Sequence, residues 1–356
     1  MSNFFSIVLL AFVIGNSNQE ECLPPLKDCS RDKVTFFLYT GANVEPQELI
    51  IDDPTSLKKA NFRSNSKFKF IVHGFTQSKD NPLMMKFRRE YFKSSYWNLI
   101  YIDWNPVATD KCYMESAVPS APKIGECAAT LLKQLFDQRP EITIDKFHFI
   151  GFSLGAQICA QISNNLKPLK IPRITGCDPA LTGSFFGPPD SVNENTLNKQ
   201  HANFVDAILT NMGAIGVSFP DAHYNIYAND GYIQPGCNEA EVSQSTTELL
   251  DIDICSHARA LQIFAESINS PLKFTAVKCD DKDAWMSEKR RCTGDHKLQI
   301  EVGEHCTPPK SENEIGIYHF YTNPRKPLAI PPPPSTDSCF FSGVFSYCKW
   351  LFSYLY

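Results

Sequence analysis

The stretch that decides the fold is Lys-Phe-His-Phe-Ile-Gly-Phe-Ser-Leu-Gly-Ala-Gln, residues 146–157. Residues 147–150 have the apolar content of a short buried strand, whereas the apolar residues within 154–162 recur at helical spacing. The periodicity therefore changes at Ser153, inside the Gly-x-Ser-x-Gly turn of residues 151–155. Glycines on both sides of a serine let a strand turn sharply into a helix and push the hydroxyl out at the top of a sheet. The stretch predicts a nucleophilic serine.

The context of this turn makes the prediction more specific than the five-residue motif, which composition alone produces fairly often. A strand before the turn and a helix after it are what a nucleophilic serine requires. The Leu154 N–H would lie at the start of that helix, where backbone donors face a developing oxyanion. The simpler interpretation is an ordinary tight turn.

Length and composition limit the function classes. The chain has 356 residues, 43% of them hydrophobic and 21% charged, which suits a globular protein with one large core or two domains. The net charge is −5 and no run of Lys or Arg occurs, so the sequence has no basic footprint for nucleic acid. We expect neutral or lipid-like partners and no nucleic acid.

The N-terminus predicts secretion. Residues 4–14 are an apolar run too short to span a membrane comfortably, and Gly15-Asn16-Ser17 follows it. We expect a signal peptide over residues 1–17 and an extracellular protein, the alternative being an N-terminal anchor. The 13 cysteines suit an oxidising compartment, and their odd number leaves at least one unpaired within the chain.

The predicted elements alternate between strand and helix, which indicates an α/β fold with a largely parallel sheet and helices on both faces. The expected strands are residues 34–39, 47–51, 68–72, 97–104, 173–175 and 204–208, and the expected helices lie within 84–92, 124–135 and 154–166.

Two turns at the ends of strands are candidates for the site. His73-Gly74-Phe75-Thr76 follows an early strand, and the Phe75 N–H can act as a second oxyanion donor beside Leu154; the alternative is an ordinary glycine turn. Asp178 follows the strand next after the serine turn, at the same carboxyl edge. It is either a catalytic acid or a turn aspartate before proline. Asp206 is the rival acid, but its place inside an apolar strand suits a structural role.

His257 is the candidate base among eight histidines. It is predicted to open a helix, whereas His73 sits in the proposed oxyanion turn and His148 in a strand facing away from the edge. The preceding residues 238–254 are polar and acidic between Cys237 and Cys255. If these cysteines pair, they close either a movable flap over the site or a plain disulfide loop.

Ser153, Asp178 and His257 occur in the chain order of serine hydrolases built on this kind of sheet. A serine hydroxyl is a poor nucleophile unless an imidazole accepts its proton. The imidazole in turn needs a carboxylate to fix its tautomer and to stabilise the imidazolium.

The sequence resembles the pancreatic lipase family over about residues 30–323. The matching motifs are Phe70-Ile71-Val72-His73-Gly74-Phe75, Ile102-Asp103-Trp104, Ile150-Gly151-Phe152-Ser153-Leu154-Gly155-Ala156, Asp178-Pro179-Ala180, Phe204-Val205-Asp206, Gln234-Pro235-Gly236-Cys237 and Cys255-Ser256-His257-Ala258-Arg259. The resemblance implies the α/β-hydrolase fold and a carboxylic-ester hydrolase acting at lipid interfaces. It implies that Ser153 is the nucleophile, Asp178 the acid and His257 the base. It also implies that the backbone N–H groups of Phe75 and Leu154 form the oxyanion hole. A lid over 238–254 would be bracketed by Cys237 and Cys255.

The resemblance is to the shorter secreted branch of the family, with venom phospholipases A1 and arthropod lipases. That branch implies no C-terminal β-sandwich, no colipase-type partner and a monomer. The stretch 210–226 looks trimmed, which favours phospholipase A1, whereas the longer lid keeps triacylglycerol lipase as the alternative. Residues 193–201 differ in type from the family's calcium-ligand stretch, so we expect no metal, and no cofactor is implied. A non-catalytic lipid-binding or yolk-like storage protein is the alternative from another class, but such proteins lose the serine.

The expected domain organisation is a lipase domain over 18–325, a Pro-rich linker over 326–338 and an aromatic tail over 339–356. The tail is either a membrane-surface patch or a segment that folds back on the core. By similarity, Cys29 is expected to pair with Cys112 and Cys279 with Cys292. The other cysteines in predicted core elements are expected to be buried thiols: Cys127, Cys159 and Cys177.

Overall fold

The computed structural model describes residues 22–41, 45–93, 96–188, 191–237, 248–279 and 298–331. The predicted signal peptide, most of the predicted lid, most of the linker and the whole aromatic tail lie outside the described residues. No helix among the described residues is both long and apolar enough to cross a membrane.

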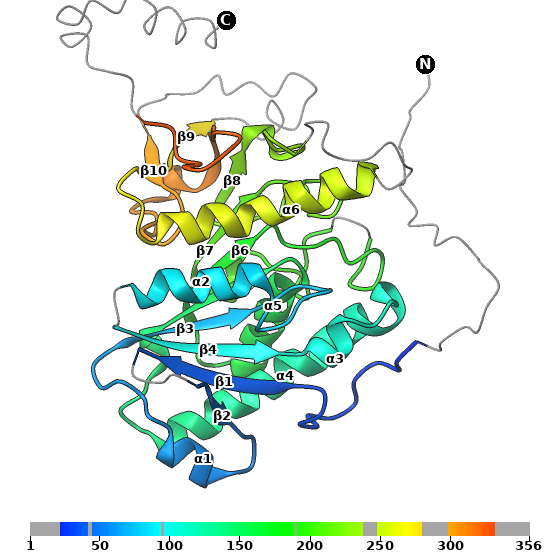
Figure 1. Ribbon diagram of the computed structural model, residues 1–356, viewed down its shortest axis with the longest axis vertical. Coiled ribbons are helices and arrows are strands. Elements are labelled where there is room, and N and C mark those ends of the chain that lie inside the picture. Colours follow the sequence, from blue (N-terminus) through cyan, green and yellow to red (C-terminus); the bar gives the residue numbers. More distant parts are fainter. Residues whose placement is uncertain are drawn as a thin grey trace, which may run out of the picture.

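An eleven-stranded sheet runs through the molecule in the order β10-β9-β11-β8-β7-β6-β5-β3-β4-β1-β2 (Figure 1). The strands from β11 to β4 in that order pair in parallel, and antiparallel strands extend the sheet at both ends, which confirms the α/β class and the largely parallel sheet. The strands are β1 (Thr35–Thr40), β2 (Gln47–Leu49), β3 (Lys67–Val72), β4 (Trp97–Asp103), β5 (Phe147–Phe152), β6 (Ile171–Cys177), β7 (Ala202–Leu209), β8 (Tyr224–Ala228), β9 (Thr275–Cys279), β10 (Gln299–Glu301) and β11 (Gly316–Phe320).

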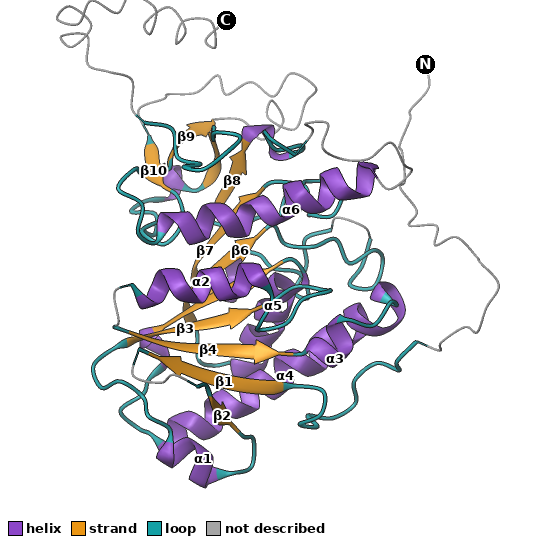
Figure 2. Ribbon diagram, viewed as in Figure 1, coloured by secondary structure: helices purple, strands orange, loops and turns teal. Residues whose placement is uncertain are grey.

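Helices cover both faces of this sheet. Helices α2 and α6 lie on the near side in Figure 2, with α4 and α5 behind. The helices are α1 (Pro54–Lys59), α2 (Pro82–Phe92), α3 (Asn105–Ala108), α4 (Val118–Gln138), α5 (Leu154–Leu166) and α6 (Glu248–Ser267). Single-turn helices are η1 (Tyr113–Ala117), η2 (Ile144–Lys146), η3 (Lys199–His201), η4 (Asn229–Gly231) and η5 (Glu312–Glu314).

Alternation along the strands explains why both faces are covered. In β5, Phe147 and Phe149 belong to the apolar cluster packed under α4 and α5, whereas Ile150 and Phe152 belong to the cluster packed under α2 and α6. Successive side chains of a strand point to opposite faces, so a central strand that is apolar throughout must be buried on both sides. All six residues of β5 are buried, and the serine turn therefore starts from a rigid support.

Helix α6 begins earlier than the sequence predicts. His257 was expected to open this helix, but α6 starts at Glu248 and His257 lies in its third turn. Residues 248–254, the last part of the predicted lid, thus form the first turns of the helix. The expectation was wrong because this polar, acidic stretch lacks the regularly spaced apolar residues by which a helix is recognised in a sequence.

The N-terminal disulfides differ from the expected pairing. Cys22 bonds to Cys112 and Cys29 to Cys127, so the expected Cys29–Cys112 bridge and the free Cys127 thiol are both wrong. The segment before β1 runs alongside residues 110–120, where the Leu23 N–H donates to Asp110 (2.8 Å) and the Leu26 N–H to Ser120 (2.9 Å). That path brings Cys22 to Cys112 and carries Cys29 onward to α4.

The other cysteine predictions have mixed outcomes. Cys159 and Cys177 are buried free thiols, as predicted, and Cys306 is a third. Cys279 is disulfide-bonded, but Cys292 lies outside the described residues, so that pairing stays a prediction.

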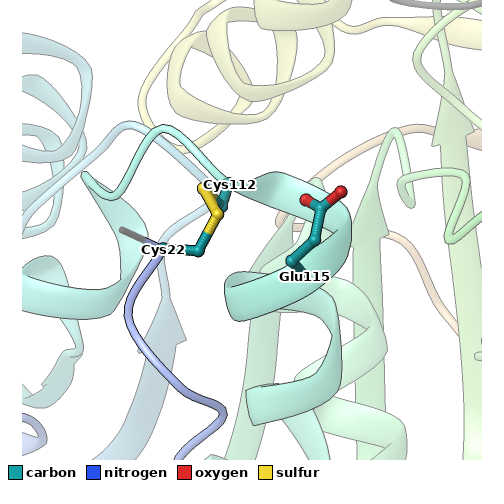
Figure 3. A group of neighbouring side chains, drawn as sticks. All are labelled: Cys22, Cys112 and Glu115. Carbon is teal, nitrogen blue, oxygen red and sulfur yellow. A yellow bond between two sulfur atoms is a disulfide. The ribbon is translucent and has the colours of Figure 1, made fainter. Parts of the chain in front are cut away.

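One group of potential metal ligands occurs among the described residues, formed by Cys22, Cys112 and Glu115 (Figure 3). Its two sulfur atoms are bonded to each other. A metal binds the thiolate form of cysteine, which a disulfide does not offer, so this group is a crosslink beside a carboxylate rather than a metal site.

Candidate active site

The turn at Ser153 has the strained backbone that its glycines predict. Ser153 adopts φ 57° and ψ −127° between the end of β5 and the first residue of α5. A Cβ atom added to Gly151 would lie 2.5 Å from the Cα of Ala156, and one added to Gly155 would lie 2.3 Å from the carbonyl oxygen of Val72. Both positions therefore exclude any side chain, and the helix start is pressed against the end of β3.

The same turn is tied to the neighbouring strand end. The Ser153 N–H donates to the Cys177 carbonyl (3.0 Å), and Cys177 pairs with Phe152 in the parallel register of β5 and β6. Asp178 directly follows Cys177. Adjacent parallel strands thus bring the serine turn and the acid to one edge of the sheet, as predicted from the sequence.

Asp178 is fully buried and held by backbone donors. It adopts φ 47°, and its N–H donates to the Ile208 carbonyl (2.8 Å). Its Oδ1 accepts hydrogen bonds from the N–H groups of Thr210 (2.7 Å) and Asn211 (3.2 Å). Gly216 closes over the carboxylate, since a Cβ there would lie within 2.8 Å of three of its atoms. These contacts leave Oδ2 as the oxygen that faces α6.

His257 meets that oxygen. Its Nδ1 lies 2.6 Å from Asp178 Oδ2, and its ring packs 4.7 Å from the ring of Phe152, the residue before Ser153. With the Nδ1 proton donated to the carboxylate, Nε2 of the neutral ring carries a lone pair. Nε2 is buried and makes no hydrogen bond to any described residue, so no Ser153–His257 hydrogen bond is formed in this structure. Ser153 is 6% and His257 7% exposed, so both side chains are buried.

The second turn lies against the serine. A Cβ atom on Gly74 would lie 2.8 Å from the Cβ of Ser153. The Gly74 N–H donates to Gln77 Oε1 (3.2 Å) and the Thr76 N–H to the Ala108 carbonyl (2.7 Å). Between them, the N–H of Phe75 has no acceptor among the described residues.

The Leu154 N–H, at the first position of α5, likewise has no acceptor within the described part of the chain. The N–H groups of Phe75 and Leu154 are thus both without acceptors among the described residues, and their role as oxyanion donors stays a prediction.

His73 has a structural role in this turn. Its ring is fully buried, stacks parallel to Trp104 at 5.2 Å, and contacts Asp103 through Nε2 at 3.2 Å. The Trp104 indole N–H donates to the His73 carbonyl (3.0 Å). These contacts fix the backbone from which Gly74 and Phe75 leave the strand, and they occupy the imidazole.

The rival acid Asp206 is also structural, as its position in a strand suggested. Both carboxylate oxygens of Asp206 accept from the Arg173 guanidinium at 2.9 Å, and Oδ1 also accepts from the Thr175 hydroxyl (2.9 Å). Burial is the largest single influence and lowers the pKa of Arg173. The charge and hydrogen bonds of Asp206, with other negative neighbours, together raise that pKa above its ordinary value, so the guanidinium stays charged. Asp206 therefore braces β6 against β7 beneath the site.

Sequence reasoning missed the residues that hold Asp178. Thr210 and Asn211 act mainly through backbone N–H groups, which leave no trace in the residue types. Their position just after β7, the strand beside β6, was the available signal, because neighbouring parallel strands end at the same edge.

The parallel sheet with helices on both faces and the strained serine turn place the chain among the α/β hydrolases. A family model described as Lipase matches residues 14–320, and the chain belongs to that Lipase family. The predicted family resemblance is thereby confirmed.

Three relatives illustrate the similarity. Pancreatic triacylglycerol lipase of Mus musculus is 29% identical over 71% of this chain and 56% of its own length. Pancreatic lipase-related protein 2 of Sus scrofa is 30% identical over 72% of this chain and 56% of its own. Inactive pancreatic lipase-related protein 1 of Homo sapiens is 29% identical over 71% of this chain and 55% of its own. The chain spans about half the length of the curated relatives it matches.

Proposed function

We propose that this protein is a secreted serine carboxylic-ester hydrolase that acts on lipids, with Ser153 as nucleophile, His257 as base and Asp178 as the acid that orients the base. The observation that carries the proposal is the 2.6 Å contact between Asp178 Oδ2 and His257 Nδ1 next to the strained turn at Ser153. A buried carboxylate bonded to one imidazole nitrogen, with the other nitrogen unpaired among the described residues, suits a base awaiting a proton.

The reaction follows from these groups. The Ser153 oxygen attacks the ester carbonyl while His257 Nε2 takes the hydroxyl proton, and the N–H groups of Phe75 and Leu154 stabilise the oxyanion. The tetrahedral intermediate expels the alcohol, which receives the proton from His257, and leaves an acyl group on Ser153. Water then attacks the acyl-enzyme and loses its proton to His257. His257 returns that proton to the departing Ser153 oxygen, and the fatty acid is released.

The substrate class we favour is a phospholipid cleaved at the sn-1 ester. Support comes from the sequence of residues 210–226, which looks trimmed relative to the triacylglycerol-cleaving members of the family. A trimmed segment here would leave space for a polar headgroup. Triacylglycerol is the alternative substrate, favoured by the similarity to the pancreatic triacylglycerol lipase of Mus musculus.

Turnover of phosphatidylcholine vesicles and of triolein emulsion tests the proposal, with Ser153→Ala as the matched control. We expect fatty acid release from phosphatidylcholine at the sn-1 position, abolished in the variant. Release from triolein alone would favour the alternative substrate, and release from neither would contradict the enzymatic proposal.

A non-catalytic lipid-binding protein is the second candidate, because one relative is named as inactive. In that case vesicles would bind the protein without hydrolysis. The presence of Ser153, Asp178 and His257 in bonded or adjoining positions favours the hydrolase.

A further inference from the structure

Asn211 is a buried residue beside the candidate acid that makes several hydrogen bonds. Its side chain is 1% exposed, and its N–H donates to Asp178 Oδ1 (3.2 Å). Its Oδ1 accepts from the Ile215 N–H (2.9 Å), and its carbonyl accepts from the Gly216 N–H (3.0 Å). The side chain thus shapes the turn that closes over the Asp178 carboxylate.

The Asn211 amide also reaches helix α6. Its Nδ2 donates to Asp253 Oδ1 at 2.9 Å. Asp253 lies four residues before His257, so the two side chains are neighbours on one face of the helix. A single residue therefore contacts the acid through its backbone and the helix that carries the base through its side chain.

Thr210 also links Asp178 to helix α6, with a weaker hydrogen bond to the helix. Its N–H donates to Asp178 Oδ1 (2.7 Å) and its hydroxyl to the His257 carbonyl (3.4 Å). The Asn211–Asp253 bond differs because a carboxylate accepts it, and such charge-assisted bonds are roughly twice as strong as neutral ones.

We propose that Asn211 is a positioning residue that ties the Asp178 carboxylate to the first turns of α6 through Asp253, and so keeps Asp178 and His257 in bonding geometry. The proposal rests on the proposed function, in which Asp178 orients His257. Loss of the tie would let the helix start move relative to the carboxylate. That movement would weaken proton transfer at His257.

Exchanging donor and acceptor tests the tie directly. Asn211→Asp places two carboxylates opposite each other, whereas Asn211→Asp with Asp253→Asn restores one amide and one carboxylate in reversed order. We expect Asn211→Asp to lower kcat on a soluble short-chain ester about tenfold with KM little changed, and the double variant to recover to within about threefold of wild type. Asp253→Asn alone should have a small effect, since two amides still hydrogen-bond.

The matched control is Asn225→Asp. Asn225 is also 1% exposed, and its side chain makes two hydrogen bonds to the backbone of Ala222 at 3.1 Å. This variant should lower the unfolding midpoint and leave kcat unchanged, which separates a general loss of stability from a loss of positioning.

Thermal unfolding of the same four Asn211 and Asp253 proteins completes the test without requiring turnover. We expect the double variant to unfold at a higher temperature than Asn211→Asp. A double variant no better than Asn211→Asp in both kcat and unfolding would overturn the inference, as would an Asn211→Asp protein with wild-type kcat. A wild-type protein that hydrolyses no ester but shows the unfolding rescue would overturn the proposed function and leave the tie standing.

Discussion

The carboxylate of Asp178 and the imidazole of His257 lie 2.6 Å apart although 79 residues separate them in the chain. Asp178 follows β6, and His257 lies in the third turn of α6 on one face of the sheet. Backbone donors fix the other oxygen of the carboxylate, so the contact is oriented by the fold and not only by mutual attraction.

The two candidate acids should respond differently to loss of charge. Asp178→Asn keeps the shape of the buried side chain but cannot stabilise the imidazolium, so we expect kcat to fall by about 10³ to 10⁴ with the fold intact. Asp206→Asn breaks a buried ion pair with Arg173, so we expect lower stability and largely retained kcat. Ester hydrolysis and thermal unfolding of both variants check this, and equal losses of kcat would contradict it.

Gly74→Ala should displace the nucleophile. The added Cβ would lie 2.8 Å from the Cβ of Ser153, so the serine turn must shift relative to the Phe75 N–H. Overpacking of this kind costs about 1–3 kcal/mol of stability, and loss of oxyanion alignment lowers kcat by about 10²-fold. Gly316→Ala, strained at φ 146° but remote from the site at the start of β11, should destabilise the protein without changing kcat.

His148 should make the fold sensitive to acid. Burial, with the positive charges of Arg173 and Lys69, holds the pKa of His148 well below its ordinary 6.5. Its Nδ1 lies 3.0 Å from Lys69 Nζ, and its Nε2 lies 2.8 Å from the Thr175 hydroxyl. Burial also lowers the pKa of Lys69 to about 8, and Glu304 opposes that shift, so Lys69 remains charged in mild acid.

The direction in which stability changes with pH follows from proton binding to His148. Below pH 6.5 the unfolded chain protonates this imidazole and the folded protein does not, so stability is full above pH 6.5 and declines as the pH falls below it. His148→Gln keeps a polar, neutral side chain and removes the titration. The unfolding free energy of the variant minus that of wild type should therefore increase as the pH is lowered from 6 to 5, by up to about 1.4 kcal/mol per pH unit. Denaturant titrations at each pH measure this difference. A difference independent of pH would contradict this assignment.

The disulfides closing the N-terminal segment should contribute to stability. Cys29 and Cys127 close a loop with a sequence separation of 98 residues. Replacing both with alanine should lower the unfolding free energy by about 2–5 kcal/mol, because the unfolded chain without the crosslink has more conformational entropy. Peptide mapping under non-reducing conditions should recover the 29–127 and 22–112 crosslinks, and a 29–112 crosslink would contradict the structure.

The serine turn and the strands around it could be predicted because both are encoded locally. The change of period at Ser153, the flanking glycines and the apolar run of β5 act within a few residues of one another. Asp178 could be predicted because it ends the strand after the serine helix. These signals depend on backbone sterics and burial, which a single sequence carries.

The remaining features depend on contacts between distant segments. Thr210 and Asn211 hold Asp178 through backbone N–H groups, which any residue type supplies. The early start of α6 lies in a polar stretch without apolar periodicity. The partner of Cys29 is decided by the path of the N-terminal segment along residues 110–120, which no spacing of cysteines reveals.

The most direct test of the central claim is labelling with a fluorophosphonate, which reacts with a serine only when a neighbouring base activates it. We predict stoichiometric labelling of wild type at Ser153, none in Ser153→Ala, and a greatly slowed reaction in His257→Ala. Labelling that persists in Ser153→Ala, or a wild-type protein that takes up no label, would contradict the account.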